Sequence, residues 1–195
     1  MILLLVGLGL TICMVYITRL LINSLTPERF QSVMRLLIPA YMLLNLYFTI
    51  LMRQPSEDYP VILMPLHCYF SVLDWDVRDF SAIGQILQGT WSAPAAFTLE
   101  PLVGVVQNLV LFMPFGFLLC GATKRPHTVR ILLAGFLLSL FIELCQLLFR
   151  LGWFEVDDIL HNALGTYLGI CLYRWMVNRA PLPARLEGHI AVVIR

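Results

Sequence analysis

Residues 139–169, SLFIELCQLLFRLGWFEVDDILHNALGTYLG, carry ionisable and amide side chains inside or at the edge of two strongly apolar segments. These polar residues are Glu143, Gln146, Asp157, Asp158, His161 and Asn162. Ionisable groups are costly in a lipid bilayer, and where they occur they mark ion pairs, ligand sites or proton pathways. The stretch therefore predicts a functional site, provided that the rest of the chain is equally apolar.

The composition of the whole chain is that of a membrane protein. Of its 195 residues 59% are hydrophobic and only 13% are charged, and the mean hydropathy is +0.83. Soluble domains have about 25% charged residues. A net charge of +1 gives no reason to expect a nucleic-acid partner. We therefore expect an integral membrane protein with membrane lipids as its surroundings.

Apolar runs of about 20 residues, the length of one membrane-spanning helix, recur along the chain. They predict an all-α membrane protein, a polytopic bundle of about five transmembrane helices. We expect the first run to remain as a membrane helix, since no basic leader precedes it and no small-residue cleavage site follows it. The five predicted spans are 2–23, 34–52, 101–121, 129–149 and 159–178.

The connections between these spans alternate in charge. Ten of the thirteen Lys and Arg residues fall on one side, and three, Arg53, Arg78 and Arg150, fall on the other. Because positive residues concentrate on the cytoplasmic side of membrane proteins, the N-terminus is predicted outside and the C-terminus inside. The predicted divisions are an N-terminal helix and cytoplasmic loop (1–33), a helical membrane domain (34–178) and a cytoplasmic tail (179–195).

The long connection between the second and third spans is too polar to cross the membrane. Within it, residues 61–72 are apolar but short and broken by Pro65, a pattern typical of a re-entrant or interfacial segment on the extracytoplasmic side. Residues 73–99 place Phe80 and Ile83 at helical spacing, which favours an amphipathic surface helix. A solvated external loop explains the connection equally well.

Helical geometry brings three polar side chains to one depth. Glu143 lies about 9 Å below the outer end of the fourth span, with Gln146 one turn nearer the surface on the same face. Asn108 descends about 10 Å from the outer end of the third span. Asn108, Glu143 and Gln146 are therefore predicted to meet inside the bundle.

The fifth span carries a second polar stripe. Asp158, Asn162, Gly165 and Gly169 share one helical face, and the two glycines permit close approach of another helix. Asp157 near the helix N-terminus can cap backbone N–H groups. Interhelical hydrogen bonds that hold the bundle together explain the amide residues as well as a ligand site does.

In the third span, Pro114 and Gly116 are predicted to serve helix geometry and packing. Pro114 removes a backbone hydrogen bond and is expected to kink the helix.

Metal and nucleophile motifs are weak in this sequence. The five cysteines have no CxxC spacing, and Asp157 with His161 supplies only two ligands, so we predict no metal site and no cofactor. No GxSxG motif indicates a nucleophilic enzyme. A binding protein is therefore favoured over an enzyme.

Three motifs in order resemble the VanZ-like family of bacterial membrane proteins. They are Asn108 with the following FMPFGFLL, SLFIELCQ with Glu143 and Gln146, and FEVDDILHNALGTYLG, and the resemblance spans about residues 36–175. This sequence departs from the family pattern at Arg150, Glu155, His161 and Ala163. The family's founder is associated with teicoplanin resistance, which implies action at the outer face of the bacterial cytoplasmic membrane.

Three functional hypotheses follow. The first is an outward-facing polar pocket that binds or shields an envelope component, such as a lipid-linked peptidoglycan precursor or a lipophilic glycopeptide. The second is an intramembrane enzyme that modifies such a precursor, with Glu143 or Asp158 as general acid or base. A small transporter with Glu143 as a proton-coupling carboxylate has the least support, because the inner halves of the spans carry few polar residues.

Overall fold

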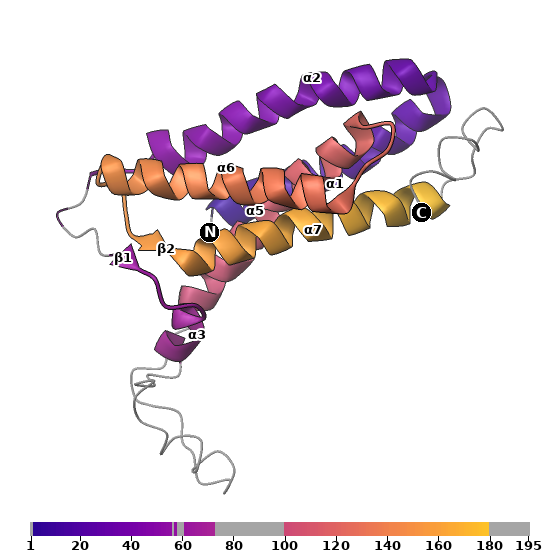
Figure 1. The fold of residues 1–195 in the computed structure, drawn as a ribbon. Coiled ribbons are helices and arrows are strands. Elements are labelled where there is room, and N and C mark those ends of the chain that lie inside the picture. The colour runs from indigo at the N-terminus through magenta and orange to yellow at the C-terminus, as the bar shows by residue number, and fades with distance from the viewer. Residues whose placement is uncertain (1, 56, 58–60, 73–99, 180–195) are drawn as a thin grey trace, which may run out of the picture.

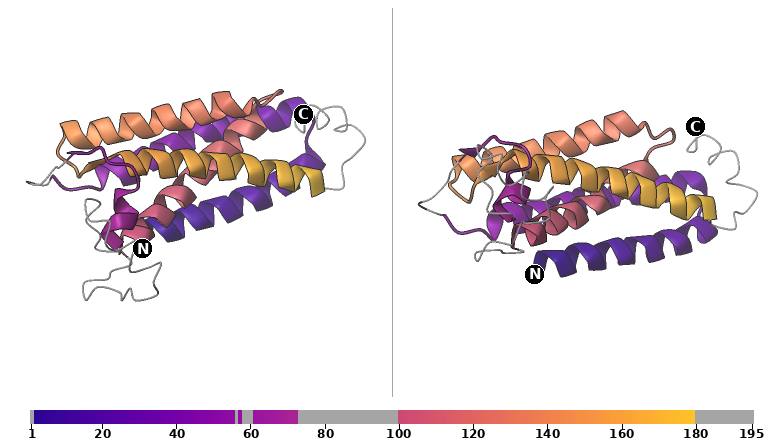
Figure 2. Two further views of the ribbon diagram at one scale, coloured as in Figure 1. Left: turned by 60° about the horizontal axis from the view of Figure 1, so that its bottom comes forward. Right: turned by 90° about the horizontal axis from the view of Figure 1, so that it is seen from below.

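The computed structural model describes residues 2–55, 57, 61–72 and 100–179. These residues form an all-α membrane bundle with one very small sheet. The long helices run roughly along one common direction (Figures 1 and 2). The elements are α1 (Ile2–Ser24), α2 (Pro27–Leu46), the π-helical turn η1 (Tyr47–Leu51), β1 (Val61–Ile62), α3 (His67–Val72), α5 (Glu100–Ala122), α6 (Thr128–Leu148), β2 (Phe154–Glu155) and α7 (Val156–Arg179).

Four of the predicted spans are long and apolar enough to cross a membrane. In the described residues these are Leu5–Ser24, Pro27–Leu51, Pro101–Ala122 and Thr128–Leu148. The fifth, α7, is as long but more polar, because it carries residues such as His161, Asn162 and Thr166, all of which are buried. A helix at the centre of a bundle turns its polar side chains towards its neighbours and away from lipid.

The outer surface of the bundle is apolar. Leucines and phenylalanines that a soluble protein would bury are exposed here, among them Leu36, Leu43, Leu133, Phe141 and Leu148. Extensive exposed apolar surface marks contact with lipid or with another protein. It agrees with a bundle that faces the hydrocarbon of a bilayer.

Close packing of α5 against α7 depends on glycines. A Cβ added to Gly116 would overlap the backbone oxygen of Thr166, and one added to Gly165 or Gly169 would overlap backbone oxygens of α5. Small residues let two helix backbones approach closely where no hydrophobic effect drives helices together in lipid. The glycine stripe of α7 and Gly116 of α5 thus lie on the two sides of one contact.

Thr166 is the point at which three helices meet. Its side chain is fully buried, its hydroxyl donates to the Asn162 carbonyl of α7 at 3.0 Å, and a Cβ on Gly135 of α6 would collide with it. The same residue thus contacts glycines of both α5 and α6. Pro114 lies within α5, which continues through it as one helix from Glu100 to Ala122.

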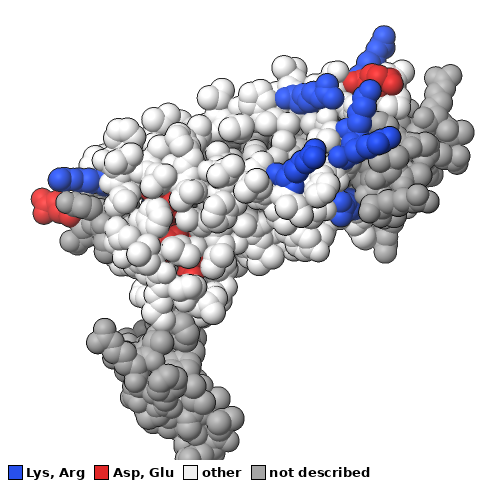
Figure 3. Space-filling model, viewed as in Figure 1, with Lys and Arg blue, Asp and Glu red and all other residues white. Residues whose placement is uncertain are grey.

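Charged side chains gather at the two ends of the bundle (Figure 3). The end at which α1 meets α2 and α5 meets α6 carries, among the described residues, Arg19, Arg29, Arg35, Lys124, Arg125, Arg130 and Arg174. The opposite end carries most of the described carboxylates, together with Arg53 and Arg150. The basic and acidic connections that alternate along the sequence therefore lie at opposite ends of the bundle.

The apolar segment 61–72 is neither a span nor a plain loop. It begins as β1, which pairs in parallel with β2 (Val61 with Phe154, Ile62 with Glu155), and it ends as α3, which packs against α5. Its position relative to the bilayer stays a prediction. The amphipathic helix expected within 73–99 and the tail beyond residue 179 lie outside the described residues. The predicted division between residues 33 and 34 falls inside α2.

Candidate functional site

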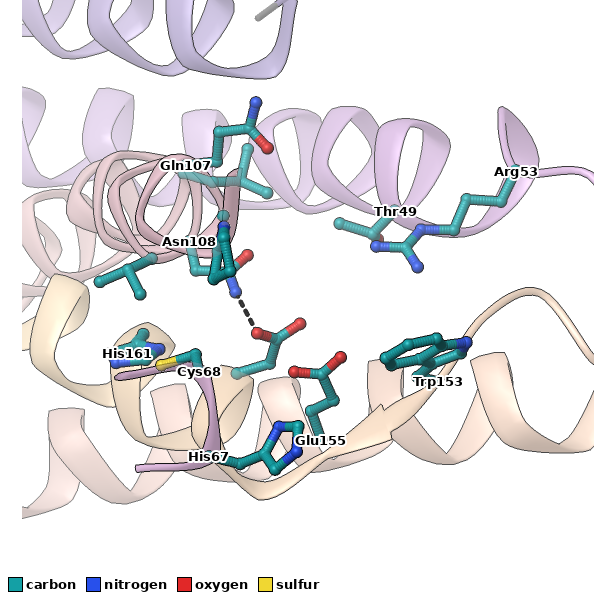
Figure 4. A pocket seen from close by; sticks show the side chains of 14 residues that line it. Thr49, Arg53, His67, Cys68, Gln107, Asn108, Trp153, Glu155 and His161 are labelled. Carbon is teal, nitrogen blue, oxygen red and sulfur yellow. Dashed lines mark hydrogen bonds between the residues drawn. The ribbon is translucent and has the colours of Figure 1, made fainter. Parts of the chain in front are cut away.

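A cavity of about 510 Å³ lies at the carboxylate-bearing end of the bundle, where α5 and α7 begin (Figure 4). Its size suits part of a lipid or another small molecule. The residues that line it come from η1, α3, α5, the α6–α7 connection and α7: Thr49, Arg53, His67, Cys68, Pro101, Gly104, Val105, Gln107, Asn108, Leu111, Trp153, Glu155, Asp158 and His161.

Asn108 and Asp158 form the hydrogen bond at the centre of this lining. The Nδ2 atom of Asn108 donates to Oδ1 of Asp158 at 2.6 Å, joining α5 to the first turn of α7 (Figure 4). Helix depth predicts that Asn108 meets Glu143 and Gln146, but its hydrogen bond goes to Asp158 of α7. The reason is the glycine contact between α5 and α7, which brings these two helices closer together than α5 and α6.

Glu143 lies behind the cavity. Its side chain is 1% exposed, and its Oε2 accepts a hydrogen bond from the backbone N–H of Glu155 at 3.1 Å. It therefore holds β2 at Glu155, whose own side chain lines the cavity. Burial, with a smaller effect of the Asp157 carboxylate, raises the pKa of Glu155 above its ordinary value.

The profile of the VanZ/LLP1 family matches residues 2–177. The chain belongs to the VanZ/LLP1 family. The match includes α1, which the sequence motifs alone had left out. The chain is also similar to Protein VanZ of Enterococcus faecium, with 32% identity over 69 residues. That alignment covers 35% of this chain and 43% of the relative, so the two are aligned over less than half of either protein. No solved structure matches this VanZ/LLP1 protein.

Gln146 contacts η1 in this VanZ/LLP1 protein and does not line the cavity. Its Nε2 donates to the carbonyl of Thr49 at 3.1 Å, at a π-helical turn. Such turns are rare in proteins, and those that occur often lie near functional sites. The Thr49 hydroxyl donates in turn to the Asn45 carbonyl at 2.8 Å. Gln146 thus supports a lining residue from behind.

The hydrogen bonds that begin at Gln146 and Thr49 extend through Asn45 and Tyr41 to α5. Asn45 Nδ2 donates to the Tyr41 hydroxyl at 2.9 Å, and that hydroxyl donates to the carbonyl of Leu111, which lines the cavity. Tyr41 and Asn45 are both buried. These bonds fix the position of α2 and η1 against α5 at the cavity wall.

Replacing Tyr41 with phenylalanine is expected to lower the free energy of unfolding by about 1–3 kcal/mol, because the buried Asn45 amide then loses its hydrogen-bond partner. The aromatic ring and its packing are retained. Tyr16→Phe, on the exposed face of α1, is the matched control and should leave stability unchanged. Thermal unfolding in detergent measures both variants. Equal melting temperatures for the two would show that the Tyr41 hydroxyl contributes nothing.

Asp157 and Asn162, both predicted site residues, also lie outside the cavity lining. Asn162 Nδ2 donates to Ser139 Oγ of α6 at 2.8 Å. This is an interhelical hydrogen bond, the alternative to a ligand site that the sequence allows for the amide residues. The Asp157 carboxylate accepts two backbone N–H groups of the 61–72 segment. The predicted polar cluster comprised Asn108, Glu143, Gln146, Asp157, Asp158 and Asn162. Of these, Asn108 and Asp158 line the cavity, and the other four hydrogen-bond outside its lining side chains.

Several lining residues were not predicted, above all Arg53 and His161. Arg53 extends from the residues after η1 towards the cavity (Figure 4). The sequence feature that could have indicated Arg53 is its position in an acidic connection, on the side that has only three of the thirteen Lys and Arg residues. His161 had been set aside as a departure from the family pattern, yet it lines the cavity and its Nε2 lies 3.0 Å from the Tyr69 hydroxyl.

The part of the chain that the structure describes brings no three His, Cys, Asp or Glu side chains together as metal ligands. The cavity lining offers two carboxylates, one guanidinium, two amides, two imidazoles, a thiol and a hydroxyl, from Glu155, Asp158, Arg53, Gln107, Asn108, His67, His161, Cys68 and Thr49. These groups can hydrogen-bond to the polar part of a ligand. Leu111, Val105 and Trp153 can contact its apolar part.

Proposed function

We propose that this VanZ/LLP1 protein binds the polar part of a lipid-linked or lipophilic cell-envelope component in the 510 Å³ cavity and shields it from other proteins. The observation that carries the proposal is the Asn108–Asp158 pair at the centre of a mixed polar and apolar lining, at one end of a lipid-facing bundle. A ligand with a polar head and an apolar tail matches that combination.

The charge distribution supports a cavity that opens to the outer face of the bacterial cytoplasmic membrane. Basic residues gather at the opposite end, as is typical of the cytoplasmic side of membrane proteins, and this supports an orientation with the N-terminus outside and the C-terminus inside. On that side a protein meets lipid-linked peptidoglycan precursors and lipophilic glycopeptides. The VanZ-like resemblance, with its association with teicoplanin, supports an effect on glycopeptide susceptibility.

Asp158→Asn is expected to reduce the amount of bound ligand about tenfold or more, because it removes the partly buried carboxylate that accepts the Asn108 hydrogen bond in the polar lining. Glu57→Gln is the control, since Glu57 is an exposed carboxylate outside the cavity lining. Lipids that co-purify with each variant are quantified by mass spectrometry, and teicoplanin susceptibility is measured at equal protein levels. Unchanged lipid binding and susceptibility in both Asp158→Asn and Glu143→Gln would refute the proposal.

The second candidate is an enzyme that modifies a lipid-linked precursor. It is favoured by one observation, that Asp158, Glu155 and His161 line the same cavity and could transfer protons to or from a bound ligand. Purified protein would then change the mass of a lipid-linked substrate, and Asp158→Asn would abolish the change while binding remained measurable. A ligand recovered with unaltered mass after prolonged incubation excludes this candidate.

A further inference from the structure

Residues 61–69 form a strap across the start of α7 (Figure 1). One end is held by the parallel pairing of β1 with β2. The other end passes through Leu66 into α3 and lies against α5 and α7.

Two side chains of α7, one helical turn apart, fasten the strap. The Asp157 carboxylate accepts the backbone N–H of Leu66 on Oδ1 at 2.5 Å and that of Cys68 on Oδ2 at 2.9 Å. On the next turn, His161 Nε2 lies 3.0 Å from the Tyr69 hydroxyl. Hydrogen bonds to a charged acceptor are about twice as strong as neutral ones, so Asp157 is the main fastening.

The strap is also one wall of the cavity. His67 and Cys68, both drawn in Figure 4, line it. The Cys68 side chain is only 8% exposed in this arrangement. Movement of the strap away from α7 would therefore remove a wall and open the cavity from that side.

The fastened strap contains backbone strain. Leu66 has a φ of +65°, in the left-handed region that non-glycine residues seldom adopt. Its side chain is half exposed, so side-chain packing does little to offset the strain. The hydrogen bond from its N–H to Asp157 holds it there. The backbone strain at Leu66 favours release of the strap, and the hydrogen bond to Asp157 favours the closed arrangement. Two opposing contributions of this kind allow a segment to adopt two states.

We infer that the strap is a lid, which opens by releasing Asp157 and thereby admits or releases the occupant of the cavity. In the open state the Cys68 thiol becomes accessible, and in the closed state it is buried against α7. Opening depends on residues 61–69 and α7 whatever the ligand, and only the admission of an occupant rests on the proposed function.

The rate at which a charged, membrane-impermeant maleimide labels Cys68 measures opening. The probe is the purified full-length chain with Cys68 as its one cysteine, the other four having been replaced by serine. Asp157→Ala should raise the labelling rate about tenfold or more, because it removes both charged hydrogen bonds. Burial and the Asp157 side chain also raise the pKa of the Cys68 thiol to about 12, so release of the strap would favour the reactive thiolate as well.

Glu57→Ala is the control, since it removes an exposed carboxylate that lies outside the cavity lining. It should change the rate by less than about twofold. A chain with Cys120 as its one cysteine, 1% exposed in α5, reports general unfolding and should stay unlabelled with Asp157→Ala. A wild-type labelling rate in Asp157→Ala, or an equal rise at Cys120, would overturn the lid.

A second variant moves the rate in the opposite direction. Asparagine tolerates left-handed backbone better than leucine, so Leu66→Asn should relieve the strain of the closed strap while keeping its N–H group. Labelling of Cys68 is expected to slow by about two- to fivefold. General destabilisation accelerates labelling and so cannot produce this slowing. An unchanged or faster rate at Cys68, with Cys120 still unlabelled, would contradict a strained lid.

Discussion

Gly116→Ala is expected to lower the free energy of unfolding by about 3 kcal/mol, the largest stability effect that the bundle predicts for a single methyl group. The added Cβ would overlap the backbone oxygen of Thr166, and that oxygen belongs to a helix, so it cannot move aside alone. The α5 and α7 helices would have to separate. Thr166 would also be displaced from Gly135, which would loosen α6.

Gly104→Ala on the same helix is the matched control. A Cβ at Gly104 meets no atom within 4 Å, so alanine there should leave stability unchanged or raise it slightly through its better helix propensity. Thermal unfolding in a single detergent compares the two variants with wild type. A Gly116→Ala protein that unfolds at the same temperature as Gly104→Ala would mean that α5 and α7 are not packed through this contact.

Gly104→Phe is expected to abolish binding at the cavity while leaving the fold intact. Gly104 lines the cavity, and the space around its Cβ position is open, so a large side chain there would occupy volume that the ligand needs. Unlike a change to Asp158 or Asn108, the substitution removes no hydrogen bond. Native mass spectrometry should show the ligand-bound mass in wild type and only the bare protein mass in the variant.

Gly9→Phe is the control for this substitution. Gly9, on α1, also has no atom within 4 Å of its Cβ position, but it lies outside the cavity lining. Both variants add the same side chain to a helix of the bundle, and they differ in whether it enters the cavity. Equal ligand occupancy in the two would refute a binding site at the cavity.

Much of the fold could be predicted from the sequence, because its main signals are local. A bilayer requires about 20 apolar residues for each span, and these runs stand out without knowledge of their partners. The boundaries of α7 were predicted within a few residues, although its buried polar face makes it less apolar than the other spans. The closeness of Gly165 and Gly169 to a neighbouring helix also follows from spacing alone.

The site was harder to predict because it depends on which helices are neighbours. Depth along each helix was sufficient to gather Asn108, Glu143 and Gln146 at one level, but depth does not say which faces meet. Asn108 hydrogen-bonds to Asp158, and Glu143 to the backbone of β2. The role of residues 61–69 depends on contacts with Asp157 some 90 positions later, of which the sequence has no local sign.

A density map of the protein purified with its native lipids tests the central claim most directly. The account predicts an elongated ligand whose polar end lies within hydrogen-bonding distance of Asp158 or Asn108 in the 510 Å³ cavity, with residues 61–69 closed over it. A cavity filled only by ordered water, in a map that shows lipids elsewhere around the bundle, would contradict it.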